Sequence, residues 1–114
     1  MEEMTSPYEV TPQAAKEQLT DRKQATLIDV REPVEFALAR IDDAELIPMA
    51  SVPAELQKLE GLADSRDLLI LCHHGVRSLQ VTMWLRAHGI ANCCSVAGGI
   101  DRWSREVDAS VPLY

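Results

Sequence analysis

Near its middle the chain runs Leu68-Leu69-Ile70-Leu71-Cys72-His73-His74-Gly75-Val76-Arg77-Ser78. The five residues up to Cys72 form a continuous apolar segment, which is typical of a central parallel strand covered on both faces. A tight loop over residues 73–76 should follow, with a helix beginning at Arg77. Because open parallel sheets bind ligands at the carboxyl ends of their strands, this stretch predicts an α/β domain with Cys72 at its ligand-binding edge.

Strand-like and helix-like segments alternate on both sides of this stretch, which supports the α/β assignment. The Thr11-Pro12 pair is a good helix start, because threonine caps a helix and proline is tolerated at its first position. The later helix should bury one face carrying Val81, Trp84, Leu85 and His88. The predicted strands are 26–30, 45–47, 68–72 and 93–96, and the predicted helices are 12–19, 34–39, one opening at 51–53, 77–88 and 100–105.

Length and composition describe an ordinary globular domain. The 114 residues are 46% hydrophobic and 25% charged, which predicts a single domain over residues 1–114 with a loose N-terminal end at residues 1–6. No apolar run approaches the roughly 20 residues that cross a bilayer, and the acidic start lacks the layout of a secretory signal. We therefore expect a cytoplasmic protein. The net charge of −7, without a basic cluster, argues against binding to nucleic acid. No membrane partner is expected either.

The three cysteines cannot all pair with one another, so they do not form a disulfide framework. Cys93 and Cys94 are neighbours on a predicted strand and should face opposite sides of the sheet. For both, a packing role is favoured over a redox role. Trp84 and Trp103 are likewise expected in the core.

The position of Cys72 favours a chemical role over the alternative of a buried structural thiol. The free N–H groups of a loop and of a first helical turn point inward and carry partial positive charge. A thiolate at their centre is stabilised relative to the thiol. The same arrangement could hold an anion brought to the sulfur, such as a sulfonate or a phosphate.

Three blocks of this sequence resemble the rhodanese family. Cys72-His73-His74-Gly75-Val76-Arg77-Ser78 is similar to its active-site loop, Cys-x-x-Gly-x-Arg-Ser/Thr. Asp29-Val30-Arg31-Glu32, with Glu35 and Ile41 after it, resembles an upstream block, and Gly98-Gly99-Ile100-Asp101-Arg102-Trp103 resembles a downstream one. The blocks keep the family's order and span nearly the whole chain. One departure is Ala39-Arg40, where the family usually has Gly-His, which leaves the local turn geometry open.

The resemblance implies a three-layer α/β/α rhodanese-like domain with a mostly parallel sheet of about five strands. It also implies a sulfurtransferase in which Cys72 takes sulfane sulfur from a small anionic donor such as thiosulfate and carries it as a covalent persulfide. The acceptor would be cyanide in an assay and a thiol or a sulfur-carrier protein in the cell. The C-terminal segment ending Val111-Pro112-Leu113-Tyr114 is similar to rhodanese domains fused to adenylyltransferases, which pass sulfur to a carrier protein. No metal or organic cofactor is implied.

The resemblance also assigns roles to residues around Cys72. Gly75 is expected to provide positive φ or close backbone approach. Arg77 either positions substrate or pairs with a carboxylate such as Asp29 or Glu32. A zinc site combining the two histidines with Cys72 is disfavoured, because the spacing is too tight for one tetrahedral centre. The predicted active-site loop comprises His73, His74, Gly75, Val76, Arg77 and Ser78, with the histidines exposed, and the predicted supporting residues are Asp29, Arg31 and Glu32.

Four other functions stay open from the sequence. A cysteine phosphatase uses a similar loop, but with five residues between cysteine and arginine, whereas this chain has four, 73–76. Arsenate reduction by a similar domain has no feature in its favour. A noncatalytic binding module is disfavoured because Cys72 is present with its full loop. An accessory sulfur carrier with little activity toward thiosulfate cannot be separated from an enzyme, because both need this loop.

Overall fold

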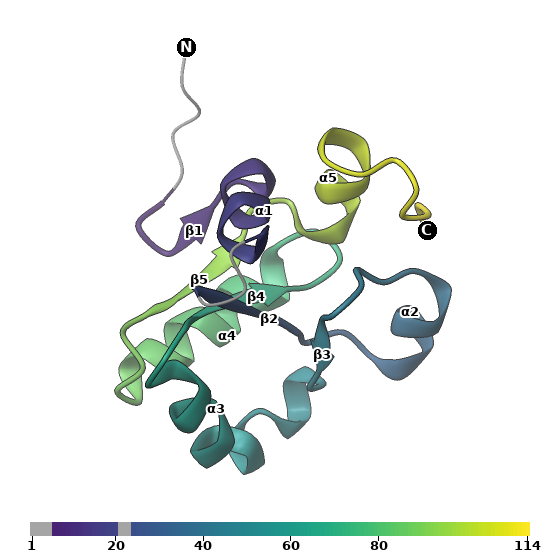
Figure 1. Cartoon of the computed structure of the whole chain (residues 1–114). Coiled ribbons are helices and arrows are strands. Elements are labelled where there is room, and N and C mark those ends of the chain that lie inside the picture. The colour runs from purple at the N-terminus through teal and green to yellow at the C-terminus, as the bar shows by residue number, and fades with distance from the viewer. Residues whose placement is uncertain (1–5, 21–23) are drawn as a thin grey trace.

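A five-stranded sheet forms the middle layer of the protein, described here by a computed structural model covering residues 6–20 and 24–114 (Figure 1). Every pair of neighbouring strands is parallel, and the order across the sheet is β1-β5-β4-β2-β3. The predicted parallel sheet of about five strands is thus confirmed. The strands are β1 (Glu9–Val10), β2 (Ala25–Asp29), β3 (Glu45–Leu46), β4 (Asp67–Leu71) and β5 (Cys93–Val96).

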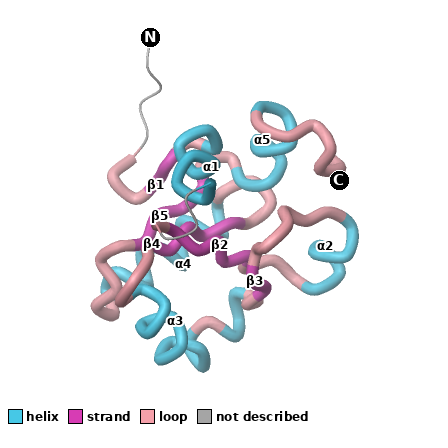
Figure 2. Tube along the Cα trace, in the orientation of Figure 1, coloured by secondary structure: helices cyan, strands magenta, loops and turns pink. Residues whose placement is uncertain are grey.

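Helices cover both faces of this sheet, and the predicted three-layer arrangement is visible in the cartoon (Figure 1) and in the tube coloured by secondary structure (Figure 2). One apolar core lies between the sheet and α3 and α4. The other lies on the opposite face, beneath α1 and α5. The helices are α1 (Pro12–Thr20), α2 (Pro33–Leu38), α3 (Leu56–Ala63), α4 (Val76–Ala87) and α5 (Gly99–Glu106), with two 3₁₀ turns at Met49–Ser51 and Pro53–Glu55.

The register of the two central strands places the candidate site. Along β2 and β4, Ile28 pairs with Ile70 and Asp29 with Leu71, so the two strands end level with each other. Val30 continues the pairing by donating its amide to the carbonyl of Leu71 at 2.9 Å. The segments that leave β2 and β4 therefore emerge side by side.

Local sequence signals account for several element boundaries. The side chain of Thr11 accepts a hydrogen bond from the amide of Ala14 at 3.1 Å, as expected for a cap before Pro12. Gly75 has a φ of 99° directly before α4, a conformation that glycine adopts without steric cost. The predicted helix starts at residues 12 and 77 agree with the structure within one residue.

Some sequence predictions fail. β1 was not predicted, because a two-residue strand is too short to show periodicity. His88 is exposed, not buried as predicted, and its ring stacks on Trp84 with centroids 3.9 Å apart. The predicted loose end at 1–6 lies outside the described residues except for Ser6, whose carbonyl accepts a hydrogen bond from Glu9 at 3.0 Å. No helix in the described parts of the chain is long and apolar enough to cross a membrane.

Candidate active site

Cys72 follows β4 directly and is buried, with 1% of its surface exposed. Two backbone amides donate hydrogen bonds to its sulfur: that of Gly75 at 3.0 Å and that of Ser78 at 3.3 Å. Both come from the loop and the first turn of α4, where helix amides have no carbonyl partner within the helix. The sulfur thus sits among partial positive charges, the environment that favours an anion.

Two serine hydroxyls extend this network inward. The Cys72 thiol donates to Ser78 Oγ at 3.2 Å, and Ser78 Oγ lies 2.7 Å from Ser95 Oγ on β5. Both serines have no exposed surface. A continuous chain of three side chains therefore leads from the sulfur into the core.

The glycine pair at the start of α5, Gly98 and Gly99, explains why the downstream block belongs to the site. The amides of Ile100 and Asp101 donate to the carbonyls of Cys72 at 2.9 Å and His73 at 3.1 Å. A Cβ at Gly99 would overlap those same carbonyl oxygens, and Gly99 has a φ of 63°. The start of α5 therefore packs against the backbone of the Cys72 loop, which only glycine allows.

Beside the loop lies a group of ionised and hydroxyl side chains, called here the charged cluster: Asp29, Arg31, Glu35, Arg77 and Tyr114. Arg31 binds Asp29 through Nη2 and Oδ2 at 2.7 Å, with both side chains fully buried. Arg31 also donates to the carbonyl of Ala39 at 2.7 Å. Burial lowers the pKa of Arg31, but hydrogen bonds with Asp29 and Tyr114 outweigh it and raise the pKa above its usual value.

Arg77 pairs with Glu35, and not with Asp29 or Glu32 as the sequence suggested. Its Nη1 and Nη2 donate to the two carboxylate oxygens of Glu35 at 2.7 and 2.9 Å. The hydrogen bonds from Arg77 lower the pKa of Glu35 to about 2, and the same contact raises the pKa of Arg77. Asp29 is not available to Arg77, because the Asp29 carboxylate already binds Arg31, two residues further along the chain.

Tyr114 joins the charged cluster to the Cys72 loop, a role that the sequence did not indicate. Its hydroxyl accepts a hydrogen bond from Arg31 Nη1 and donates one to Glu35 Oε2, both at 2.8 Å. Its ring lies flat on that of His73, with centroids 3.9 Å apart and planes 7° apart. His73 is therefore half-buried and not exposed as predicted, and this burial lowers its pKa.

His73, His74 and Asp101 bring possible metal-ligand atoms within 4.8 Å of one another. The two imidazole rings are stacked, with centroids 3.9 Å apart and planes 28° apart. Lone pairs of imidazole nitrogens lie in the ring planes, so those of stacked rings run side by side and do not converge on one ion. The arrangement does not favour a metal centre, and the sequence-based expectation of a site without metal stays a prediction.

Two predicted site residues contribute little through their side chains. Val76 is 67% exposed and begins α4. Glu32 is exposed at the start of α2, where its amide donates to Glu35 Oε1 at 3.1 Å. Ala39, which replaces the family's usual glycine, has an extended backbone with φ of −160°, which any residue can adopt, so this departure does not disturb the turn.

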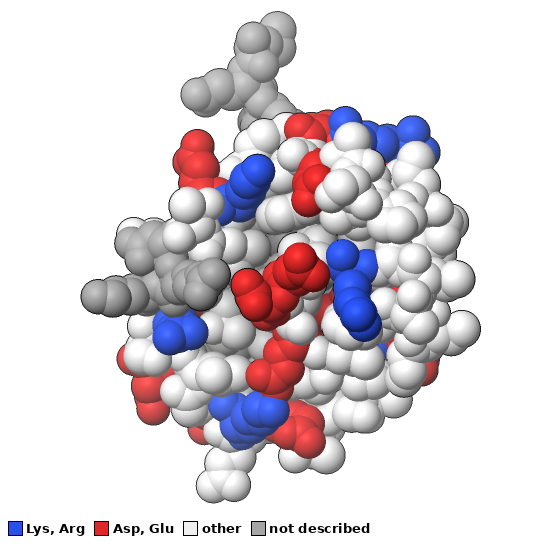
Figure 3. All heavy atoms as spheres, turned by 45° about the vertical axis from the view of Figure 1, so that its right-hand side comes forward, with Lys and Arg blue, Asp and Glu red and all other residues white. Residues whose placement is uncertain are grey.

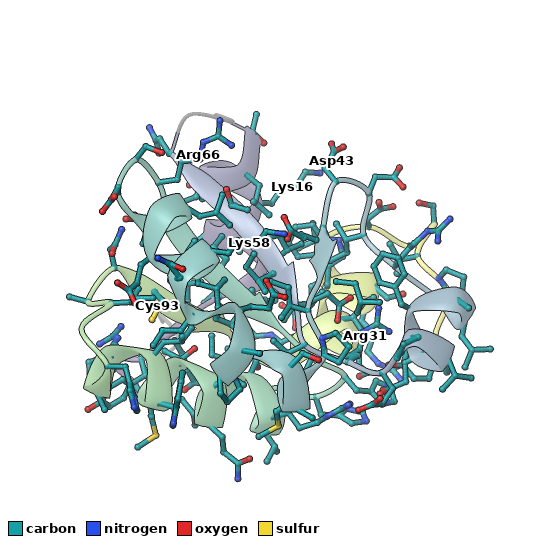
Figure 4. All side chains as sticks on the ribbon, turned by 90° about the horizontal axis from the view of Figure 1, so that it is seen from below. Lys16, Arg31, Asp43, Lys58, Arg66 and Cys93 are labelled. Carbon is teal, nitrogen blue, oxygen red and sulfur yellow. The ribbon has the colours of Figure 1, made fainter. Side chains whose placement is uncertain are left out.

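The other two cysteines lie on opposite sides of the sheet, as predicted. Cys93 belongs to the core beneath α4, whereas Cys94 packs on the other face and accepts a hydrogen bond from Arg86 at 3.2 Å. Figure 4 shows Cys93 far from Arg31 along the sheet. Trp103 is buried and Trp84 packs against the core, so both have packing roles.

A pocket of about 630 Å³ lies away from Cys72. Its lining includes Lys16, Asp43 and Arg66 (Figure 4) and the first residues of β2. The strands are parallel, so this pocket lies at the N-terminal ends of the strands. Cys72 lies at the opposite, C-terminal ends. Figure 3 shows one face of the protein, where acidic side chains gather near the middle with basic side chains scattered around them and form no broad basic area on that face.

Comparison with known proteins reveals clear relatives. The rhodanese-like domain family matches residues 11–106. A sulfurtransferase of Allochromatium vinosum is 31% identical over 97 residues, covering 85% of this chain and 88% of that protein. A crystal structure of a rhodanese-related protein from Thermoplasma volcanium superposes with a TM-score of 0.78 at 28% identity, covering 93% of this chain and 98% of that one.

Other relatives are much longer proteins. A rhodanese-like/PpiC domain-containing chloroplast protein of Arabidopsis thaliana is 35% identical over 92 residues, which is 80% of this chain. The probable adenylyltransferase/sulfurtransferase MoeZ of Mycobacterium tuberculosis is 30% identical over 105 residues, which is 92% of this chain. This chain spans only 31% of the first protein and 26% of the second.

Proposed function

This chain belongs to the family of rhodanese-like domains, and we propose that it is a sulfurtransferase that carries sulfane sulfur as a persulfide on Cys72. The observation that carries the proposal is the position of the sulfur, 3.0 Å from the amide of Gly75 and 3.3 Å from that of Ser78. Uncharged donors aimed at one atom stabilise a thiolate before the reaction and a persulfide anion after it. Relatives that are themselves named sulfurtransferases support the same activity.

In the first step the Cys72 thiolate attacks the outer sulfur of a donor. With thiosulfate, a new S–S bond forms to Cys72 while the S–S bond of thiosulfate breaks, and sulfite leaves with the bonding electron pair. The total charge is unchanged, because a thiolate and a dianion give a persulfide anion and a dianion. This is covalent catalysis by a cysteine nucleophile.

In the second step an acceptor takes the outer sulfur and regenerates the thiolate. Cyanide would leave as thiocyanate, and a thiol would leave as a persulfide of its own. Because MoeZ combines a related domain with an adenylyltransferase, a sulfur-carrier protein is a reasonable physiological acceptor. The two half-reactions share one site, so ping-pong kinetics should follow.

The amides, and not the arginines, are the donors that this mechanism requires. Arg31 is already paired with Asp29, and Arg77 is already paired with Glu35. The sulfonate of a donor such as thiosulfate would be held by backbone N–H groups around Cys72. The pairing of Arg77 with Glu35 also weakens the phosphatase alternative, because a phosphatase needs an arginine that binds the phosphate directly.

The first test is the intact mass of the purified protein after thiosulfate, measured before and after cyanide. We expect the wild-type protein to gain one sulfur atom that cyanide removes as thiocyanate. Cys72→Ser should gain none, because serine cannot form a persulfide. Cys94→Ala is a matched control that removes the more accessible of the other two thiols and should load normally.

The outcomes separate the alternatives. Loading from an organic persulfide but not from thiosulfate would overturn thiosulfate as donor and support a sulfur carrier. Loading that persists in Cys72→Ser would overturn the assignment of the nucleophile. If no donor loads the wild-type protein while a phosphate ester is hydrolysed, the phosphatase reading replaces this one.

A further inference from the structure

Ser95 is a buried hydroxyl outside the Cys72 loop, contributed by β5. Its oxygen lies 2.7 Å from Ser78 Oγ, which in turn lies 3.2 Å from the sulfur of Cys72. Ser95 and Ser78 have no exposed surface, and Cys72 has 1%. The two hydroxyls are therefore shielded from bulk water, and the hydrogen bonds of the three groups depend on one another.

We propose that Ser95 is a positioning residue that acts through Ser78 to stabilise negative charge on the sulfur of Cys72. This inference rests on the proposed function in one respect: that function identifies the anion at Cys72 as a thiolate or a persulfide. Ser95 itself does not touch the reacting atom. Its effect reaches the sulfur through the hydroxyl of Ser78.

The direction of the hydrogen bonds depends on whether the sulfur is charged. When Cys72 is a thiol, its hydrogen points to Ser78 Oγ, and Ser78 donates to Ser95. The hydrogen of Ser95 then has no partner among the hydrogen bonds of the described residues. When the sulfur is an anion, the chain reverses: Ser95 donates to Ser78, and Ser78 donates to the sulfur.

In the reversed chain every hydroxyl hydrogen is used. Each hydrogen bond polarises the next one, and bonds that end on an ion are about twice as strong as neutral ones. The chain therefore contributes more to the anion than to the thiol. Removing Ser95 should shift the balance toward the thiol.

Other charged groups surround Cys72, but replacement of Ser95 leaves them in place. Arg77 on α4 interacts electrostatically with the sulfur and is paired with Glu35 of α2. Other ionisable groups near the loop are contributed by neighbouring elements. They include His73, His74 and Asp101, Asp29 and Arg31 at the end of β2, and Tyr114, whose ring stacks on His73. Because these groups are common to all the variants below, a difference between variants reports on the hydroxyl chain.

The test is the rate of Cys72 alkylation by iodoacetamide, measured as a function of pH. The mass of the Cys72 peptide reports the reaction, so Cys93 and Cys94 do not contribute, and the midpoint of the rate profile is compared between variants. In Ser95→Ala the midpoint should move up by roughly half a pH unit, about a threefold loss of thiolate below the midpoint. The rate at high pH should be unchanged, because the thiolate is then fully formed. Sulfur loading from thiosulfate should fall by the same factor at pH values below the midpoint.

Thr82→Val is the matched control, because Thr82 is equally buried on α4 and its hydroxyl has no hydrogen-bond partner among the described residues. It should leave the midpoint unchanged. The effect of Ser95→Ala should also disappear in a Ser78→Ala background, since the proposed path runs through Ser78. Cysteine has a weak donor of a size similar to serine, so the alkylation midpoint of Ser95→Cys should lie between those of wild type and Ser95→Ala. This variant replaces Ser95→Ala in the test if the alanine variant does not fold.

Two results would overturn the inference. One is a midpoint in Ser95→Ala equal to that in Thr82→Val. The other is a shift of the same size with and without Ser78, which would indicate a general packing effect. Failure of the proposed function gives a different result, because the wild-type protein would then take up no sulfur while its alkylation profile could still be measured.

Discussion

The Cys72 loop and the charged cluster lie next to each other but handle charge in opposite ways. Around the sulfur, the hydrogen-bonding groups are two backbone amides and a serine hydroxyl. In the charged cluster, guanidinium groups meet carboxylates at 2.7 Å. The loop is thus arranged to receive an anion, whereas the cluster has already neutralised its own charges. Arginines beside a reactive cysteine therefore need not be substrate-binding groups.

Gly99→Ala should have the largest effect on the loop. A Cβ there would lie 2.5 Å from the carbonyl oxygen of Cys72 and would push the loop away from α5. Since displacement of a reactive group by about 1 Å can cost 10²-fold in rate, sulfur loading should fall by about that factor. The measurement is the loading rate by intact mass. Gly89→Ala is the matched control, because Gly89 has a φ of 98° but no atom within 4 Å of a new Cβ; an equal loss in both variants would contradict the close-approach explanation.

Arg31→Met should have the largest effect on the charged cluster. It leaves the fully buried carboxylate of Asp29 without its partner, which costs about 3–5 kcal/mol of unfolding free energy. Urea denaturation measures this loss. In Arg31→Met/Asp29→Asn no unpaired charge remains, so part of the stability should return. If the double variant is no more stable than the single one, the ion pair is not the reason for the loss.

Glu35→Gln tests the partly exposed end of the cluster, the pair of Glu35 with Arg77. The pKa of Glu35 is lowered from 4.5 to about 2, so its contribution to stability is present above pH 4.5 and is lost as the pH falls toward 2. The variant should be less stable than wild type at neutral pH by about 1–3 kcal/mol, a range that allows for partial solvent screening. The difference should shrink across this acid window in urea melts recorded at several pH values. A difference that stays constant over the window would mean that the carboxylate charge does not matter.

Tyr114→Phe should have the smallest effect. It removes the hydroxyl that bridges Arg31 and Glu35 but keeps the ring that stacks on His73. We expect a loss of about 1 kcal/mol in unfolding free energy and nearly normal sulfur loading. Tyr114→Ala, which also removes the ring, should slow loading further because His73 loses its support. Equal loading by the two variants would show that the stacked ring does not position the loop.

The sequence predicted the parts of this protein that depend on neighbouring residues. A continuous apolar run followed by a glycine-containing loop indicates a buried parallel strand, its end and the helix start after it. Those local features place Cys72 correctly, and the three sequence blocks identify the family. The pairing of Asp29 with Arg31 also joins residues only two positions apart.

The tertiary structure alone decided which distant groups meet. Arg77 binds Glu35, which is 42 residues away, Tyr114 binds Glu35 across 79 residues, and Ser78 meets Ser95 across 17. The sequence offered several carboxylates for Arg77, and only the level ends of β2 and β4 bring Glu35 within reach. Hydrogen-bond partners depend on distances of a few tenths of an ångström, and these are set by the packing of the sheet and helices and not by local sequence.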